Sequence, residues 1–274
     1  MTLVAAWVRT IRNTKHLVVA SDSRLTGGMK WDCCPKIMPL NRGDSVICFA
    51  GATYYAYPII LQVSMMVNMH DKINSRAMDI SELQPSITNI MNTMLQYRDD
   101  FPTCGADIPD VKFLFAGFSW RYSRFMIWVH EYSQANSMFV CTRVKKNFDV
   151  GSGFSFWFMG DNEREATDSL VKELSKTRTK GKPYKIDMEP FDVLMSYCSD
   201  KKCHEIGGPI QLVKIYKHMN YVPFNVLWPD RNGNKTLLGR PLLDYERNKF
   251  LTIDASSKRI TDPWGSEIEH NPSE

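Results

Sequence analysis

Short apolar runs alternate with polar turns over the first 51 residues of the chain. The runs at residues 3–8 and 16–22 are joined by the polar stretch RTIRNTK, a pattern typical of an antiparallel pair of strands. A second pair, at residues 36–40 and 45–51, flanks the turn-rich sequence NRGD. The pattern therefore predicts four strands and three turns before any helix.

Helical spacing replaces this alternation after residue 51. Tyr57, Ile60, Leu61, Ser64 and Met65 fall on one face of a segment that runs to about residue 69. The sequence SELQ, which starts at Ser81, has the pattern of a capping box and predicts a second helix that ends near Tyr97. Two helices in succession are therefore expected between blocks of strands.

Strands return in the second half of the chain and are followed by two further helices. Runs rich in Phe, Ile, Val and Trp at residues 112–118, 124–131 and 138–144 predict a three-strand meander. Helices are expected at residues 161–176 and 189–200, followed by a strand at residues 209–216. Because each element must bury its apolar side, this order predicts an α+β fold in which two stacked sheets are covered by helices, a four-layer αββα sandwich.

Composition sets limits on the class of protein. The 274 residues are 43% hydrophobic, and 34 Lys and Arg against 30 Asp and Glu give a net charge of +4, which argues against nucleic acid or an anionic membrane as the partner. The chain has neither an apolar run long enough to span a membrane nor a signal-peptide pattern. Seven cysteines form no regular disulfide framework, which fits a reducing compartment. A soluble, cytoplasmic protein is therefore expected.

The cysteines also raise the question of a metal. Cys33 and Cys34 are adjacent, and Cys198, Cys203 and His204 cluster later in the chain. Structural zinc sites use paired ligands at spacings such as C-x₂-C, and neither cluster has that spacing. We therefore expect no metal and no cofactor.

The chemistry of the N-terminus suggests a function. Thr2 follows the initiator methionine and directly precedes the first strand. Aminopeptidases remove methionine readily before a small residue, so Thr2 is expected to become the N-terminus with no further processing. Its own α-amine, with an ordinary pKa of about 7.7–8.0, could then act as the base that activates its hydroxyl. A nearby lysine would lower that pKa further, and the lysine would need a carboxylate to hold it charged.

Several motifs follow Thr2 in order along residues 2–216. They are VVASDSR from Val18, PKI from Pro35, FAG from Phe49, GSG from Gly151 and IGGPIQLVKI from Ile206. This ordered set resembles proteasome β-type subunits and their bacterial HslV-like relatives, which are N-terminal-nucleophile (Ntn) hydrolases. The resemblance implies an Ntn hydrolase domain over residues 2–216. It leaves residues 217–274 as a β-rich C-terminal extension packed on the same domain.

The resemblance also implies a role for individual residues. Thr2 would be the nucleophile, Lys36 would supply positive charge, and Asp22 would orient and neutralise Lys36. The backbone N–H of Gly51 would stabilise the oxyanion, and Ser152 would lie beside the N-terminal amine. The first specificity pocket, for an apolar or bulky side chain, would be lined by Leu25, Thr26, Cys34, Phe49 and Thr53.

One segment departs from the family pattern. Family members usually carry an aspartate, two further residues and a serine before the closing glycines, whereas this chain has CHEIGG at residues 203–208. Asp200, Glu205 or His204 could substitute for the missing pair, and the sequence does not choose among them.

Three functions remain open on the sequence. The first is a threonine peptidase that cleaves amide bonds through an acyl-enzyme on Thr2. The second is a non-catalytic scaffold or ring subunit of the same fold, and the third is an amidase for small molecules. The expected partners are a peptide or protein substrate, further copies of the chain in a ring or stacked rings, and an unfoldase or regulatory protein.

Overall fold

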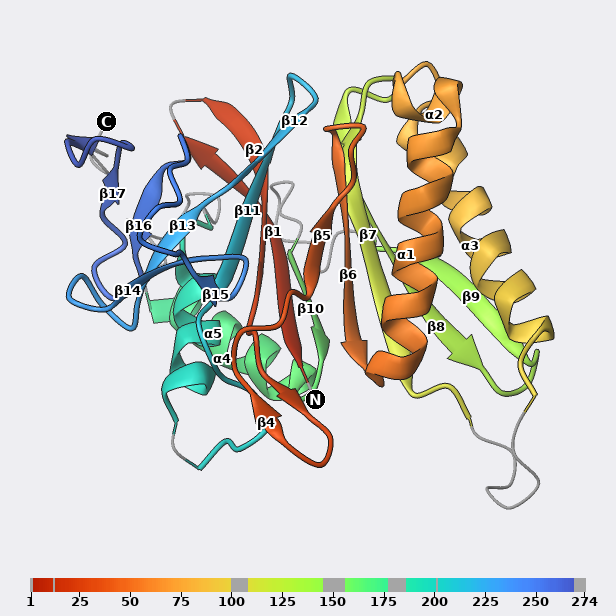
Figure 1. Cartoon of the computed structure of the whole chain (residues 1–274), viewed down its shortest axis with the longest axis horizontal. Helices are drawn as coiled ribbons and strands as arrows, with labels where there is room; N and C mark the ends of the chain where they lie inside the picture. Colours follow the sequence, from red (N-terminus) through yellow and green to blue (C-terminus); the bar gives the residue numbers. More distant parts are fainter. Residues whose placement is uncertain are drawn as a thin grey trace.

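The computed structural model describes residues 2–11, 13–99, 108–144, 156–176, 186–200 and 202–268. These ranges form a mixed α/β fold with several sheets (Figure 1). The first sheet has five antiparallel strands in the order β10-β1-β2-β11-β12. They are β1 (Leu3–Ile11), β2 (Thr14–Ser21), β10 (Phe156–Gly160), β11 (Gln211–Tyr216) and β12 (Asn220–Pro223). The predicted pairing of the first two strands is confirmed, in a register that sets Val4 opposite Ser21.

The second sheet also has five antiparallel strands, in the order β5-β6-β7-β8-β9. They are β5 (Ile37–Pro39), β6 (Ser45–Gly51), β7 (Val111–Ser119), β8 (Arg124–Ser133) and β9 (Met138–Arg143). The predicted meander is confirmed, because β7, β8 and β9 pair in succession. A short hairpin, β3 (Leu25–Thr26) with β4 (Lys30–Trp31), connects the two sheets along the chain.

Helices pack on one face of each of these sheets (Figure 1). Helices α4 (Glu163–Lys176) and α5 (Glu189–Ser199) pack on the first sheet, and α1 (Thr53–Met69), α2 (Asp71–Asn74) and α3 (Ile80–Gln96) pack on the second. A separate apolar cluster combines residues of both sheets, among them Val4, Val19, Val46, Leu114 and Val213. Within the described ranges, none of the helices combines the length and apolar character needed to cross a bilayer.

Strand β1 belongs to two cores at once. Leu3, Ala5 and Trp7 pack in the cluster with α4 and α5, whereas Val4 and Ala6 pack against the second sheet. Successive side chains of a strand point to opposite faces, so a strand buried on both faces is apolar throughout rather than alternating. This explains the continuous apolar run at the start of the sequence, and it fixes Thr2 at the buried end of β1.

The second predicted helix begins one residue before the predicted position and is capped differently. Its N-cap is Asp79, whose side chain accepts a hydrogen bond from the Ser81 N–H at 2.9 Å, while Glu82 accepts from the Asp79 N–H at 3.1 Å. The capping box is therefore Asp79 with Glu82, and Ser81 lies inside the helix. The misassignment arose because aspartate and serine are both good N-caps and stand two residues apart.

The chain beyond Tyr216 adds β12 to the first sheet and forms a further sheet. That sheet has the order β15-β14-β13-β16-β17-β18, and its strands are β13 (Asn225–Trp228), β14 (Asn234–Leu237), β15 (Arg240–Pro241), β16 (Thr252–Asp254), β17 (Ile260–Thr261) and β18 (Glu267–Ile268). Val226, Ile253 and Ile260 are buried in the same cluster as Phe191 of α5. The extension thus shares the apolar core of the first sheet.

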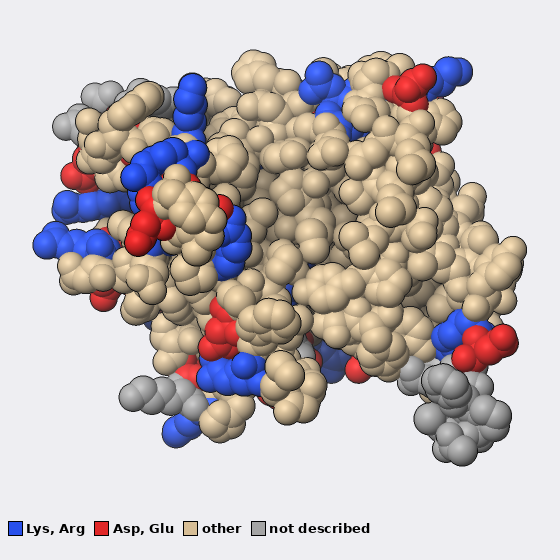
Figure 2. Space-filling model, viewed as in Figure 1, with Lys and Arg blue, Asp and Glu red and all other residues tan. Residues whose placement is uncertain are grey.

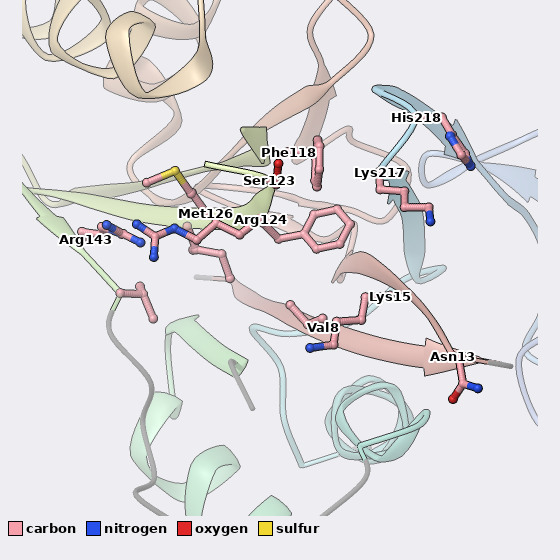
Figure 3. A pocket seen from close by; sticks show the side chains of 13 residues that line it. Val8, Asn13, Lys15, Phe118, Ser123, Arg124, Met126, Arg143, Lys217 and His218 are labelled. Atoms are coloured by element: carbon pink, nitrogen blue, oxygen red, sulfur yellow. The ribbon is translucent and has the colours of Figure 1, made fainter. Parts of the chain in front are cut away.

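Two surface features stand out. The face of the molecule over α1 shows almost no charged side chains (Figure 2), and the sequence of α1 contains no Asp, Glu, Lys or Arg. A cleft is lined by residues of both sheets and by several basic side chains (Figure 3).

Candidate active site

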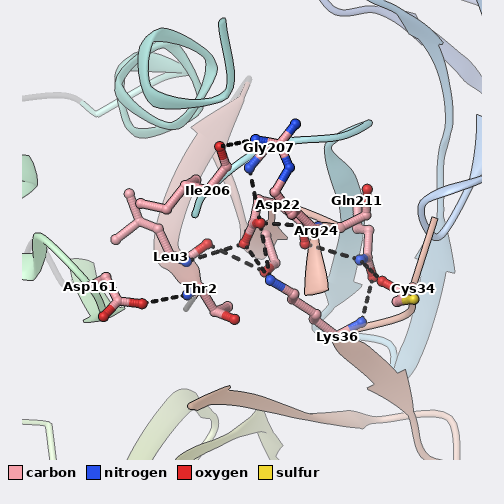
Figure 4. Close-up of polar contacts among 12 residues, drawn as sticks. Thr2, Leu3, Asp22, Arg24, Cys34, Lys36, Asp161, Ile206, Gly207 and Gln211 are labelled. Atoms are coloured by element: carbon pink, nitrogen blue, oxygen red, sulfur yellow. Dashed lines mark hydrogen bonds and ion pairs between the residues drawn. The ribbon is translucent and has the colours of Figure 1, made fainter. Parts of the chain in front are cut away.

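A buried ion pair lies beside the start of β1. Lys36 and Asp22 are both 0% exposed, and the Lys36 ammonium lies 3.0 Å from each carboxylate oxygen of Asp22 (Figure 4). Asp22 follows the last residue of β2, and the β1–β2 register places it opposite Leu3. The Leu3 N–H donates to Asp22 Oδ1 at 3.2 Å, so the ion pair contacts the residue that directly follows Thr2 in the chain. The structure thus brings Thr2, Asp22 and Lys36 together.

The Asp22 carboxylate is held by several donors besides Lys36. The backbone N–H groups of Arg24 and Gly207 donate to Oδ2 at 3.1 and 3.2 Å. Burial raises the pKa of Asp22 above its ordinary value, while Lys36 and the N–H groups of Gly207 and Leu3 act in the opposite direction. Removal of one partner from a buried pair leaves an uncompensated charge, so the fold needs both Asp22 and Lys36, whatever chemistry the pair performs.

Gln211 fixes the loop that carries Lys36. Its side-chain oxygen accepts from the N–H groups of Lys36 and Ile37 at 3.0 and 3.2 Å. Its nitrogen donates to the carbonyls of Asp22 and Cys34 at 3.1 and 2.9 Å. Gln211 lies in the IGGPIQLVKI motif, but no feature of the sequence indicated that its amide would link β11 to both charged residues.

The nitrogen of Thr2 donates to the carboxylate of Asp161 at 2.5 Å. The Asp161 N–H in turn donates to the Thr2 carbonyl at 2.8 Å. Gly160 allows this approach: it has a φ of +113°, and a Cβ there would lie 2.0 Å from the Thr2 carbonyl oxygen and 3.0 Å from the Cβ of Ala50. Asp161 was missed as a site residue. The available signal was the Gly-Asp pair at the end of an apolar run directly before a helix.

Ser152, predicted beside the N-terminal amine, lies outside the described residues, and its role stays a prediction. Among the described residues, the carboxylate that reaches the Thr2 nitrogen is that of Asp161.

The divergent CHEIGG segment is held by an arginine. The Arg24 guanidinium forms two hydrogen bonds to Asp32, at 2.6 and 2.9 Å, and donates to the His204 carbonyl at 3.1 Å. Gly207 packs directly on it, since a Cβ there would lie 2.4 Å from the guanidinium carbon of Arg24.

The three residues that could have replaced the missing family pair do not reach the site. Asp200, His204 and Glu205 are all exposed. Asp200 accepts from the Lys202 N–H at 2.8 Å, and within the described ranges none of the three hydrogen-bonds to Thr2, Asp22 or Lys36.

Gly51 lies at the end of β6 with a φ of +106°. A Cβ at this position would lie 2.2 Å from the Asp110 carbonyl oxygen, so a larger residue does not fit. Its neighbour Ala50 packs close to Gly160, which places the end of β6 near the Thr2–Asp161 contact. The oxyanion role of Gly51 stays a prediction.

The predicted pocket residues are only partly brought together. Phe49 is 0% exposed and contacts Tyr57 of α1 edge to face, with ring centroids 5.1 Å apart. Leu25 packs against the apolar cluster of the second sheet that contains Phe49. The Tyr57 hydroxyl donates to the carbonyl of Pro35 at 3.2 Å, and Pro35 directly follows the buried Cys34. Burial raises the pKa of Tyr57 to about 12. The sequence did not indicate Tyr57 as part of this pocket.

The other two predicted pocket residues are more peripheral. Thr26 is exposed on β3, and Thr53 is half-buried at the first position of α1. Their substrate-binding roles stay predictions.

Chemically, the described site offers a hydroxyl, a buried cation with its carboxylate, and a second carboxylate on the Thr2 nitrogen. Among the described residues, no group of three or more His, Cys, Asp or Glu side chains is arranged to hold a metal ion.

In comparisons with known proteins, no family model matches the chain and no curated protein matches it. The geometry of the site is therefore the basis for inferring a function.

Proposed function

We propose that the protein is an N-terminal threonine hydrolase that cleaves amide bonds, with peptides as the substrate class. The observation that carries the proposal is the fully buried Asp22–Lys36 pair, one residue from Thr2 at the start of β1. Burying two charges is costly, and this pair is built where an N-terminal threonine would need a lysine.

The proposed chemistry begins with removal of Met1. In the full chain the Thr2 nitrogen belongs to a peptide bond, and removal of Met1 converts it to an α-amine. This amine takes the proton of the Thr2 hydroxyl as Oγ1 attacks the substrate carbonyl carbon. Lys36 favours the neutral amine by like-charge repulsion, and the Gly51 N–H stabilises the oxyanion.

Two bond changes complete the cycle. Collapse of the tetrahedral intermediate breaks the amide bond, and the leaving amine takes the proton held by the Thr2 α-amine. The remaining ester on Thr2 is hydrolysed by a water molecule that the same amine activates, which regenerates the hydroxyl and releases the acid.

The arrangement of the sheets supports the proposed fold family. Two five-stranded antiparallel sheets share an apolar cluster, and each carries its helices on its other face. We propose that this is the four-layer αββα sandwich of Ntn hydrolases, in which the nucleophile begins the first strand.

One observation favours a second candidate, a non-catalytic subunit of the same fold. The Asp161 carboxylate contacts the Thr2 nitrogen directly, and a carboxylate there favours the protonated α-ammonium, which cannot act as a base. The proposed enzyme must therefore overcome this bias through Lys36 or work at alkaline pH.

The first experiment is the intact mass of the C-terminally tagged protein before and after incubation with a peptide epoxyketone. This reagent forms bonds to both the hydroxyl and the free amine of an N-terminal threonine. We expect loss of Met1 and a single adduct on Thr2. Thr2→Ala should lose Met1 without forming the adduct.

The proposal fails if Met1 is retained. Loss of Met1 without an adduct calls for a panel of fluorogenic peptides and small amides over pH 6–10, where inertness towards all of them would favour the scaffold. Turnover of small amides alone would identify an amidase instead of a peptidase.

A further inference from the structure

A cleft of about 810 Å³ lies between the two sheets and is lined by side chains of both (Figure 3). Its walls include Val8 of β1, Lys15 of β2, the β7–β8 turn and the turn after β11. Val8 is six residues beyond Thr2 on the same strand, which corresponds to about 20 Å at 3.3 Å per residue. A ligand in this cleft would not need to contact the proposed active site.

The lining combines an apolar floor with a basic rim. The floor includes Val8, Phe118, Phe125, Met126, Ile127 and Val144, and the rim consists of Lys15, Arg124, Arg143, Lys217 and His218. Among the described residues that line the cleft there is no aspartate or glutamate. The arginines come from β8 and β9, whereas Lys15 comes from β2 and Lys217 and His218 come from the turn after β11 (Figure 3).

The five basic side chains of the rim are all solvent-exposed. Within the described ranges, none of the five forms an ion pair, and Arg124 instead lies over the Tyr122 ring at 5.2 Å. Burial and the neighbouring Arg124 both lower the pKa of Arg143. Many other basic side chains do pair with a carboxylate, among them Arg9, Arg24, Lys36, Arg42, Lys112 and Arg121.

We propose that this cleft binds an extended acidic peptide segment that carries apolar side chains. A concave surface lined by one sign of charge attracts the opposite sign, and the unpaired rim leaves that attraction uncompensated. The apolar floor would bury the apolar side chains of the peptide, while the carboxylates that alternate with them would face the basic rim.

The distribution of charge favours a peptide over other anions. A single phosphate group needs donors that converge on one point, whereas these basic groups are spread along two walls that belong to different sheets. A nucleic acid would match the charge, but its phosphodiester backbone would leave the apolar floor without a partner. An alternating acidic and apolar peptide satisfies both the rim and the floor.

The test uses a fluorescein-labelled heptapeptide of alternating glutamate and leucine, and fluorescence anisotropy with the full-length protein. We expect saturable binding that weakens several-fold when NaCl is raised from about 50 to about 300 mM, because the rim is solvent-exposed. The same peptide with lysine in place of glutamate should not bind.

The decisive variant is Arg124→Glu with Arg143→Glu, compared with Lys72→Glu plus Lys202→Glu, which makes the same charge change at exposed positions outside the cleft. We expect at least about tenfold weaker binding for the first pair and less than about threefold for the control pair. Thermal melting should show both folded.

Three outcomes would overturn the proposal. They are no saturable binding at millimolar peptide, equal losses in the two double variants, and equally effective competition by a poly-dT oligonucleotide, which would indicate a general polyanion surface.

Discussion

The position of Asp161 bears most directly on the chemistry of Thr2. Its carboxylate lies 2.5 Å from the Thr2 nitrogen, held by Gly160, where the backbone conformation and the close Thr2 carbonyl exclude a side chain. We therefore treat Asp161 as a positioning residue that also biases the amine towards its charged form.

Replacement of Asp161 tests this bias. In Asp161→Asn the negative charge is lost while a polar group of the same shape remains, so the amine should lose its proton at lower pH. We expect the acid limb of the kcat/KM profile to move down by about one pH unit. Glu173→Gln, which removes an exposed negative charge that pairs with Lys176 on α4, should leave the limb in place. An unshifted limb in Asp161→Asn would show that Asp161 does not favour the charged amine.

A second residue-scale prediction concerns stability. Lys214 is 3% exposed, and its ammonium lies 4.4 Å from the Phe224 ring centroid. Burial lowers the pKa of Lys214 to about 7, with Arg9 acting in the same direction and Asp187 against it. Between about pH 7 and pH 10 the unfolded chain binds the proton that the folded chain has lost, so the free energy of unfolding should rise with pH.

Lys214 raises the free energy of unfolding by at most about 1.4 kcal/mol per pH unit. Lys214→Met should remove this rise and should stabilise the protein at pH 7, whereas the exposed Lys217→Met should change neither. Urea unfolding at several pH values measures both effects. An unchanged slope in Lys214→Met would mean that Lys214 stays charged in the folded protein.

At the scale of elements, α1 presents a surface suited to contact with another protein. Tyr54, Leu61, Met65 and Met69 are between 49% and 81% exposed and repeat at helical spacing along a helix without charged residues (Figure 2). A contiguous exposed apolar stripe of this kind marks interaction surfaces. We propose that it contributes to self-association, which agrees with the expected homo-oligomer.

A pair of charges placed on this stripe tests the proposal. Leu61→Glu with Met65→Glu should convert an oligomer to monomers in sedimentation velocity, because glutamate would be buried without a partner. Asn89→Glu with Thr93→Glu, exposed one turn apart on α3, is the matched control and should leave assembly unchanged. A wild-type protein that is monomeric at micromolar concentration would contradict the proposal.

Element predictions succeeded where a local pattern was strong. The strand at residues 45–51 has the predicted bounds, and α1 ends at the predicted residue. The strand β10 was not predicted, because its sequence FWFMG is short, aromatic and equally compatible with other buried segments. The cap of α3 was misassigned because two competent caps stand close together in the sequence.

For the whole molecule, the sequence by itself determined most of the order of strands and helices, since hydrophobic periodicity is local, but it did not indicate β10 or the short β3–β4 hairpin. It also indicated Thr2, Asp22 and Lys36 as a chemical set, and the structure places these three together. Only the tertiary structure decided which distant groups complete the set: Asp161 is 159 residues from Thr2, and Gln211 is 175 residues from Lys36. Their positions depend on how β10 and β11 pair across the first sheet, and strand pairing over such separations leaves no periodic signal in the chain.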